Sequence, residues 1–459
     1  MTTLTITPRF DPPRTLPTVP TVATVSTGWH RSLPDLLGSG FRLREPRLSD
    51  VDQLTAAFSG DAASVLGVGV PGTSDQWMHF VARARAGRAA GHAACFVVVP
   101  DGTPDVCGLI LLQRLAPGSR VATVSFGHAN TGRAADLPVR SLACALAFAF
   151  RAVGVGRVEG RACSPREVEL VRRLGAVTEG VLRGSHPVAD GFADQTLWAV
   201  LATDWDQCRL GAKTEPVRME LERPVSGGPT TGDGTGDRPP AWTMRLPTLK
   251  GQLVTMREID LLDAAVLMEA LEPADLEISI EPVPTSPDQF RRYISWVQSQ
   301  RSAGRAAGFA IVPRGSRRAA GLVQIRLDDV SGAAAEWGLV LAQRFRGTGA
   351  ALEAAQLLAG FAFETLGVHR LEARASGIDP RSTGLFRKMG AVREAHLRLS
   401  FVRGNEVLDD DLWSILKPDW RGVHPGRRRR QVASATGGQR VSVTTQTKVR
   451  PPARPGRRV

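Results

Sequence analysis

The chain has 459 residues, enough for two or three domains, and a formal net charge of +13. Residues 421–459 hold eleven basic residues and no acidic one, which leaves the rest of the chain close to neutral, so the high isoelectric point is largely a property of the C-terminal end. No apolar run approaches the length of a membrane span, and the five cysteines are scattered, without zinc-site spacing; this argues against a membrane protein, a disulfide scaffold and a zinc domain.

The N-terminal segment is rich in Pro and Thr up to about Ser39. It has no basic region followed by an apolar run, so it does not resemble a signal peptide. We expect residues 1–40 to be disordered. With scattered cysteines and no export signal, the expected compartment is the cytoplasm.

The next feature is a long repeat. The segment Gly156–Ala162 matches His369–Ala375 at an offset of 213, and Arg173–Arg183 matches Lys388–Arg398 at an offset of 215. The ends agree as well, since Leu197–Trp205 matches Leu412–Trp420, again at 215. Solenoid repeats are far shorter, so the pattern predicts two copies of a domain, over residues 41–205 and 245–420. Residues 206–244, with a Gly/Pro/Thr-rich stretch, are predicted to be a flexible linker.

The second copy contains a glycine-rich loop, Arg344-Phe-Arg-Gly-Thr-Gly-Ala350. An apolar strand is predicted before it over Ala335–Leu341, and a helix after it over Gly349–Leu366, with Gly367 as the stop. Glycines allow the backbone N–H groups to approach an anion closely, and a helix N-terminus adds unpaired N–H groups and a positive dipole end. The loop therefore predicts a diphosphate site, although Gly-x-Gly is also common in ordinary turns.

A further strand, Gly367–Arg374, follows the helix, and then comes Asp379-Pro-Arg-Ser-Thr-Gly-Leu-Phe-Arg-Lys-Met-Gly-Ala391. This order of strand, Arg-x-x-Gly-x-Gly, helix, strand and Lys-x-Gly resembles the GNAT superfamily of N-acetyltransferases, and most of all its RimJ/RimL-type branch. The resemblance covers Arg245 to Trp420. Ser382, Lys388, Gly390, Glu394, Leu397 and Arg398 fit the branch pattern, whereas Asp379 replaces an Asn, Ala391 a Phe and Ala395 a Gly.

The resemblance implies an α/β (α+β) fold in which each domain is a mixed, mostly antiparallel sheet flanked by helices. It also implies acetyl-CoA as co-substrate, with no metal. The strand before the loop splays from its neighbour in the family and binds the pantetheine arm through its backbone. The implied cofactor-binding residues are Leu339, Val340, Arg344, Phe345, Arg346, Gly347, Thr348, Gly349, Ala350, Asp379 and Phe386.

Two side chains are candidates for catalysis. Glu336 is the candidate base for the amine, through water, and the alternative is a solvated or salt-bridged strand residue. Ser382 is the candidate acid or sulfur-side donor, and the alternative is a structural role at a helix N-terminus. Asp379 cannot donate a hydrogen bond as the family's Asn does, and its alternative role is a helix cap. Phe386 stands where many members have Tyr, and the chain's only Tyr is Tyr293, so a Tyr acid at that position is excluded.

The first copy lacks the paired glycines. Its equivalent stretch, Thr131–Pro138, carries Asp136 where a diphosphate would sit, and Ser164 and Glu167 stand at the positions of Asp379 and Ser382. We therefore expect this copy to have lost cofactor binding or to bind weakly; the alternative is that it binds acetyl-CoA through other contacts.

Two classes of function stay open. The first is an N-acetyltransferase that modifies a protein N-terminus or a small-molecule amine, with the second domain active. The alternative is a non-catalytic acyl-CoA-binding or interaction protein. The basic tail, residues 421–459, is expected to be disordered, either as a solubilising extension or as a weak polyanion tether to RNA or the ribosome. It lacks the aromatic residues that stack on bases.

Overall fold

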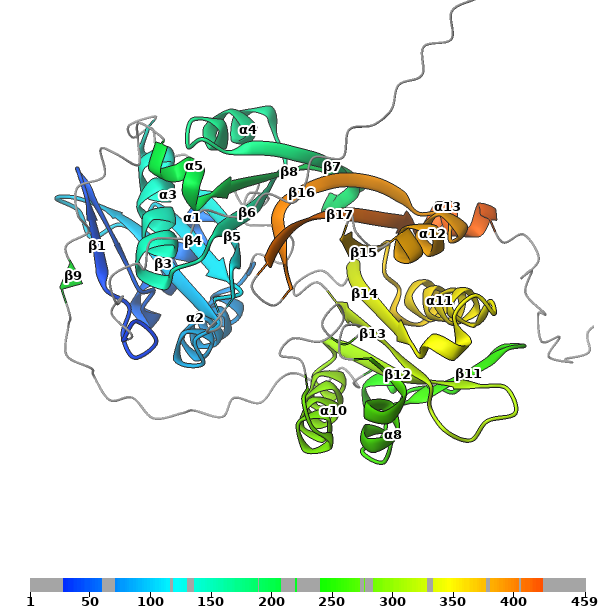
Figure 1. The fold of residues 1–459 in the computed structure, drawn as a ribbon. Helices are drawn as coiled ribbons and strands as arrows, with labels where there is room; N and C mark the ends of the chain where they lie inside the picture. Colours follow the sequence, from blue (N-terminus) through cyan, green and yellow to red (C-terminus); the bar gives the residue numbers. More distant parts are fainter. Residues whose placement is uncertain are drawn as a thin grey trace, which may run out of the picture.

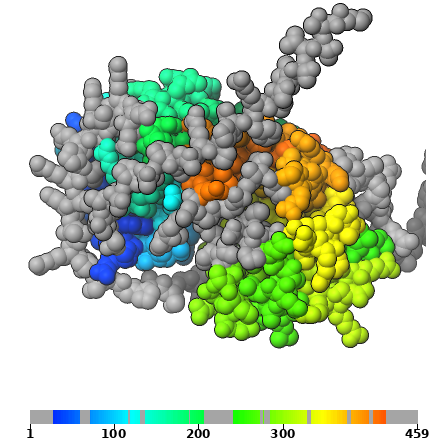
Figure 2. All heavy atoms as spheres, viewed as in Figure 1, coloured from blue at the N-terminus to red at the C-terminus, as the bar shows by residue number. Residues whose placement is uncertain are grey.

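The computed structural model describes residues 28–59, 71–115, 119–129, 136–188, 190–207, 219–220, 240–272, 276, 284–327, 333–376, 380–403 and 406–423. The two segments that resemble each other in sequence form two halves that lie side by side (Figure 1). Figure 2 shows the same arrangement in space-filling form, with the C-terminal strands of the second half, in orange, next to the first half.

The first half alternates strands and helices. Its elements are β1 (Asp35–Gly38), β2 (Phe41–Arg44), α1 (Val51–Ala57), α2 (Ser74–Ala89), β3 (Ala93–Pro100), β4 (Gly108–Gln113), β5 (Val121–His128), α3 (Leu137–Ala147) with a wider turn over Phe148–Val153, β6 (Arg157–Ala162), α4 (Pro165–Arg172), β7 (Val177–Val188), β8 (Gly191–Leu201), α5 (Ala202–Gln207) and β9 (Met219–Glu220).

The second half repeats this order. Its elements are α7 (Ala241–Met244), β10 (Leu249–Lys250), β11 (Val254–Glu258), α8 (Asp263–Ala270), α10 (Pro287–Ser302), β12 (Ala306–Pro313), β13 (Gly321–Leu327), β14 (Ala334–Leu341), a short turn Gln343–Phe345, α11 (Ala350–Phe361) with a wider turn over Ala362–Leu366, β15 (Arg370–Ser376), α12 (Pro380–Lys388), β16 (Val392–Arg403), β17 (Glu406–Leu416) and α13 (Lys417–Val423).

Pair by pair, the described strands run in the order β9-β1-β2-β3-β4-β5-β6-β8-β7-β16-β17-β15-β14-β13-β12-β11-β10. Only β5–β6 and β14–β15 are parallel pairs; the other registered pairs are antiparallel. Helices cover the sheet of each half, which confirms the predicted fold class of mixed, mostly antiparallel sheets flanked by helices.

Each half has an apolar core on both faces of its sheet. In the second half, α11 packs with Trp337, Phe309 and Trp413 on one face, while α8 and α10 pack with Val340 and Leu322 on the other. The first half has the same layout, with α3 on one face and α1 and α2 on the other. The sheet thus holds β14 between two helical layers.

The sheets of the two halves meet where Gly180 of β7 pairs with Ala395 of β16. These are the same position of the repeat, since they differ by 215. A Cβ at Gly180 would lie only 2.2 Å from the carbonyl oxygen of Glu394, so glycine lets the two backbones approach closely. A residue that pairs with its own counterpart is the mark of a two-fold contact between like surfaces.

Two predicted boundaries are wrong in part. Residues 35–38, expected to be disordered, form β1, because Leu36 is fully buried and the strand pairs with β2. Residues 241–244, expected to be linker, form the helix α7, because Trp242 is buried in the second core. Residues 1–27, most of the expected linker and residues 424–459 of the tail lie outside the described residues.

Candidate active site

The two parallel strands of the second half separate after a short pairing. Ala334–Glu336 of β14 pairs with Arg370–Glu372 of β15, and β15 then continues to Ser376 against β17. From Trp337 onward, β14 pairs only with β13 on its other side among the described strands. Backbone groups on that edge of β14 are therefore not used by β15, and they are available to hydrogen-bond an extended ligand.

The loop after β14 has the backbone that its glycines predict. Gly347 has φ of 76° and Gly349 has φ of 88°, and Gly349 is the N-cap of α11. The first bond of the helix runs from the amide of Glu353 to the carbonyl of Gly349, so the amides before it point out of the helix end. A loop of this shape fits a diphosphate, because it presents backbone donors and the positive end of the helix dipole together.

Side chains hold this loop in place. Thr348 donates to the carbonyl of Phe345 at 2.7 Å, and Arg346 Nε donates to the carbonyl of Leu341 at 3.2 Å. Arg344 is exposed, with its guanidinium 5.1 Å from the centre of the Phe345 ring. Arg346 thus braces the end of β14, while Arg344 is the arginine of the loop best placed to meet a ligand phosphate.

The side chains of β14 alternate between the two faces of the sheet. Trp337, Leu339 and Leu341 belong to the core on the α11 side, and Val340 belongs to the core on the α8 and α10 side. Phe386 of α12 is also buried, with its ring 5.7 Å from that of Trp337. Leu339, Val340 and Phe386 can therefore contribute backbone atoms and an apolar wall, but no side-chain polar group.

Ser382 lies in the first turn of α12 and is partly buried. Helix α12 begins at Pro380, as the sequence pattern predicts. Asp379, the candidate cap or cofactor ligand, lies outside the described residues. In the sequence, α12 is the next element after β15, the strand that diverges from β14.

Glu336 forms ion pairs. One carboxylate oxygen lies 3.0 Å from Arg326 of β13, and the other lies 3.6 Å from Arg374 of β15. Burial raises the pKa of Glu336, but the charges of Arg326, Arg374 and Arg114 outweigh burial and hold its pKa at about 2. A carboxylate with so low a pKa is a weak proton acceptor at neutral pH, which favours the salt-bridged interpretation of this residue.

An opening lies beside Glu336 on the same face of β14. Gly338 is exposed, and a Cβ built on it would meet no atom within 4 Å. Its partner on β13 is Gln324, whose side-chain oxygen accepts a hydrogen bond of 2.6 Å from Tyr293 of α10. The face of β14 away from α11 therefore offers space and polar groups next to the diverging strands.

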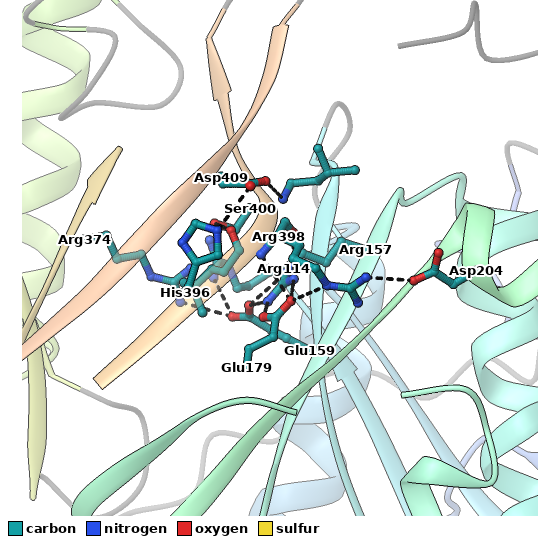
Figure 3. Close-up of polar contacts among 12 residues, drawn as sticks. Arg114, Arg157, Glu159, Glu179, Asp204, Arg374, His396, Arg398, Ser400 and Asp409 are labelled. Atoms are coloured by element: carbon teal, nitrogen blue, oxygen red, sulfur yellow. Dashed lines mark hydrogen bonds and ion pairs between the residues drawn. The ribbon is translucent and has the colours of Figure 1, made fainter. Parts of the chain in front are cut away.

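The first half contributes charges to this neighbourhood. Arg374 donates to Glu159 of β6 at 3.1 Å, and Arg114, next to β4, lies 3.8 Å from Glu159 (Figure 3). The two-fold counterpart of the first contact is Arg161 with Glu372, at 3.6 Å. The segment Arg-x-Glu-x-Arg, which the sequence shows twice, thus forms the junction of the halves.

Further buried pairs extend this junction. Arg157 contacts Glu159 and Glu179 at 2.9 and 2.6 Å and donates to the carbonyl of Arg398 at 2.7 Å. Its counterpart Arg370 contacts Glu372 and Glu394, each at 2.7 Å, and donates to the carbonyl of Arg183. Each arginine thereby joins its own half to the other.

Sequence reasoning missed Asp410 of β17. This side chain is 4% exposed, and its Oδ1 has no hydrogen-bond partner in the part of the chain that the structure describes. It lies opposite Ser376, the last residue of β15. The signal in the sequence was the run of Asp409, Asp410 and Asp411 inside an otherwise strand-like segment.

In the first half, the positions equivalent to Gly349 and to the start of α12 carry residues that remove or occupy backbone donors. Its helix α3 has Asp136 at the N-cap, with φ of −95°, where α11 has Gly349. Pro138 in the first turn lacks an N–H, which removes one donor from this helix end. At the start of α4, Ser164 accepts from the amide of Glu167, and the Glu167 carboxylate accepts from the amide of Cys163 at 2.7 Å. This capping box occupies two amides at the start of α4.

The described ranges contain neither a metal site nor a helix that could span a membrane. No group of three or more His, Cys, Asp or Glu side chains is arranged to hold a metal ion. None of the helices combines the length and apolar character needed to cross a membrane.

Known proteins resemble part of the chain. Residues 254–392 match the family model described as the acetyltransferase (GNAT) domain. The chain is 26% identical over 178 residues to the uncharacterized N-acetyltransferase p20 of Bacillus licheniformis. This match covers 39% of the present chain and 100% of p20. It is 29% identical over 85 residues to the uncharacterized N-acetyltransferase YnaD of Bacillus subtilis (strain 168), covering 18% of this chain and 50% of that one.

Solved structures with a similar fold include a GNAT-family acetyltransferase from Bacillus anthracis, with 20% identity, a TM-score of 0.33, and coverage of 37% of this chain and 98% of that one. Another is RimL, the ribosomal L7/L12 alpha-N-protein acetyltransferase in complex with coenzyme A, with 16% identity and a TM-score of 0.35. This match covers 38% of the present chain and 99% of the RimL chain. The match to the family model shows that residues 254–392 are a GNAT acetyltransferase domain, and together with the N-acetyltransferase relatives it makes the chain an acyltransferase.

Proposed function

We propose that the protein transfers an acetyl group from acetyl-CoA to a primary amine, and that the second half carries out the reaction. The observation that carries the proposal is the divergence of β14 from β15 directly before the loop with Gly347 and Gly349. A pantetheine arm fits along the free edge of β14, and a diphosphate fits on the amides at the start of α11. The N-acetyltransferases among the relatives support this donor and this type of acceptor.

In this proposal each part of the site has one task. Bound acetyl-CoA supplies the thioester, whose carbonyl carbon reacts with the amine. Backbone N–H groups near Leu339 and Val340 polarise the carbonyl oxygen. The amine approaches from the face of β14 that holds Gly338 and Glu336, and Ser382 donates a hydrogen bond on the sulfur side as the C–S bond breaks.

The two halves have unequal tasks. We propose that the chain is a tandem duplication in which the first half no longer holds acetyl-CoA, because Asp136, Pro138 and the capping box at Ser164 replace its ligand-binding features. Its remaining task is to support the acceptor side of the second half through Arg114 and Glu159.

The direct test is turnover. Purified full-length protein is incubated with acetyl-CoA and a set of primary amines that includes peptides with free N-termini, polyamines and aminoglycosides, and released CoA thiol is measured. We expect thiol release that depends on the amine, with acetylated product detected by mass spectrometry. Tight binding of acetyl-CoA without turnover on any amine would instead support a non-catalytic acyl-CoA-binding protein.

The role of Ser382 leads to a first prediction for a variant. Ser382→Ala should lower kcat by about a hundredfold or more, because general acid–base groups contribute rate factors of that order, while the KM for acetyl-CoA changes little. Ser302→Ala, at the exposed end of α10, is the control and should behave as wild type. An unchanged kcat in Ser382→Ala would assign this serine to the helix end alone.

The basic tail, most of which lies outside the described residues, leads to a second prediction. Removing everything after Gly422 should leave the melting temperature and acetyl-CoA affinity unchanged, but weaken retention on RNA or heparin. If several arginines contact phosphates, log affinity falls with log salt at a slope of about −0.7 per contact on single strands, and truncation should flatten it. An equally steep slope after truncation would place the polyanion surface on the folded halves.

A further inference from the structure

Asp410 lies on the acceptor face of the second half. In an antiparallel pair, residues directly opposite each other project to the same side of the sheet. Asp410 is opposite Ser376, two positions after Arg374 on β15, and Glu372 is in register with Glu336 on β14. Asp410, Arg374 and Glu336 therefore share the face that contains the opening at Gly338, whereas Trp413 and Ile415 of β17 project into the opposite core.

One oxygen of the Asp410 carboxylate is left unused by its surroundings, although the amide of Asp411 donates to this side chain. It is 96% buried and its Oδ1 accepts no hydrogen bond from the described residues, although buried polar atoms almost always have a partner. The arginine nearest in register, Arg374, is instead held by Glu159 and Glu336. A buried carboxylate oxygen left without a donor is costly for folding, so the structural contacts of the side chain do not account for it.

From this geometry we propose that Asp410 is the residue that accepts a proton from the amine acceptor. The inference rests on the proposed acetyl transfer. The protonated amine gives its first proton to Asp410, which passes it to solvent. The nitrogen then forms its bond to the thioester carbon, the C–S bond breaks, and the second proton of the nitrogen ends on the CoA sulfur. The products are an amide, free CoA thiol and one proton.

The charges around Asp410 suit a proton acceptor at neutral pH. Burial raises its pKa most, Arg374 on β15 and the amide of Asp411 lower it, and Glu336 on β14 and Asp411 raise it, with a resulting pKa of about 7. On β16 the facing residue is the apolar Leu397, and from the first half Arg114 and Glu159 face Arg374 and Glu336. Glu336 thus acts as a positioning residue that holds Arg374 and keeps the proton affinity of Asp410 high.

The test compares three variants of the full-length protein by the pH dependence of kcat/KM, with the best amine from the turnover screen. Asp410→Asn should lower kcat/KM by about a hundredfold or more above pH 7 and remove the acid limb of the profile near pH 7. Glu336→Gln should keep that limb but move it to lower pH, because loss of a negative neighbour favours the ionised form of Asp410. Asp409→Asn is the matched control, because this exposed aspartate lies one residue earlier on the opposite face and is not among the charges that shift the pKa of Asp410. It should keep the wild-type profile.

Stability gives a second readout with a defined sign. The pKa of Asp410 is higher in the folded than in the unfolded chain, so this group destabilises the fold more as pH rises from about 4 to about 7. Asp410→Asn should therefore melt at a higher temperature than wild type at pH 8, with the difference vanishing toward pH 4. This also shows that the variant is folded.

The experiments distinguish a failure of the proposed role of Asp410 from a failure of the proposed acetyl transfer. A wild-type protein that acetylates an amine, together with an Asp410→Asn variant that keeps the rate and acid limb of Asp409→Asn, would overturn the role of Asp410 and leave acetyl transfer intact. A wild-type protein that releases no thiol with any amine would overturn the proposed function, and the role of Asp410 would fall with it.

Discussion

Replacing Gly347 and Gly349 with valine is expected to abolish acetyl-CoA binding. Both residues have φ between 76° and 88°, a region that β-branched residues rarely adopt, so the loop must leave the conformation that presents its amides. At Gly349 a Cβ would also lie 3.2 Å from Leu253, whereas at Gly347 it would meet no protein atom and would occupy space left for the ligand. Isothermal titration of the full-length variant with acetyl-CoA should give a Kd weaker by at least about a hundredfold, since several hydrogen bonds to charged groups are lost together.

The control separates this effect from general damage to the fold. Gly315, in the turn between β12 and β13, has φ of 79° and open space around it, so Gly315→Val carries a comparable backbone strain far from the loop. This variant should bind acetyl-CoA as wild type does. If both variants bind equally well, the loop does not hold the diphosphate.

Replacing Arg370 with methionine is expected to destabilise the whole chain by about 3–5 kcal/mol, because it takes a close ion-pair partner from each of two buried carboxylates. Glu372 is left with Arg161 at 3.6 Å, and Glu394 with Arg183 at 2.7 Å. Arg370 is fully buried and also donates to the carbonyl of Arg183 in the other half. Its counterpart Arg157 makes the same contacts from the first half, so Arg157→Met should cost a similar amount. The free energy of unfolding is measured with denaturant.

A matched control comes from an exposed pair. Arg172 lies 3.3 Å from Glu169 on the surface of α4, and surface ion pairs contribute only about 0–1 kcal/mol, so Arg172→Met should change stability little. Equal, small effects from all three variants would show that the junction does not hold the halves together.

The structural features that the sequence predicts best are those determined by residues close together in the chain. The positive φ of Gly347 and Gly349, the start of α11 at Ala350 and the start of α12 at Pro380 all follow from local patterns of glycine, proline and apolar residues. The alternation that separates Trp337 from Val340 follows from the two-residue period of a strand. These features need no knowledge of the partner strands.

Contacts across strands are harder to predict. Glu336 meets Arg326, ten residues earlier, and Arg374, thirty-eight later, and only the register of β13, β14 and β15 brings them together. The sequence shows the repeated Arg-x-Glu-x-Arg motif, but not that one copy faces the other. Asp410 was missed for the same reason, since its burial depends on β15, β16 and the first half at once.

The most direct test of the account is a crystal structure of the full-length protein with acetyl-CoA. The account predicts density for the pantetheine arm along β14 where it leaves β15, and for the diphosphate on the amides of residues 347–350, with none between β5 and α3 of the first half. Density in the first half, with the loop from Arg344 to Ala350 empty, would reverse the assignment of the active half.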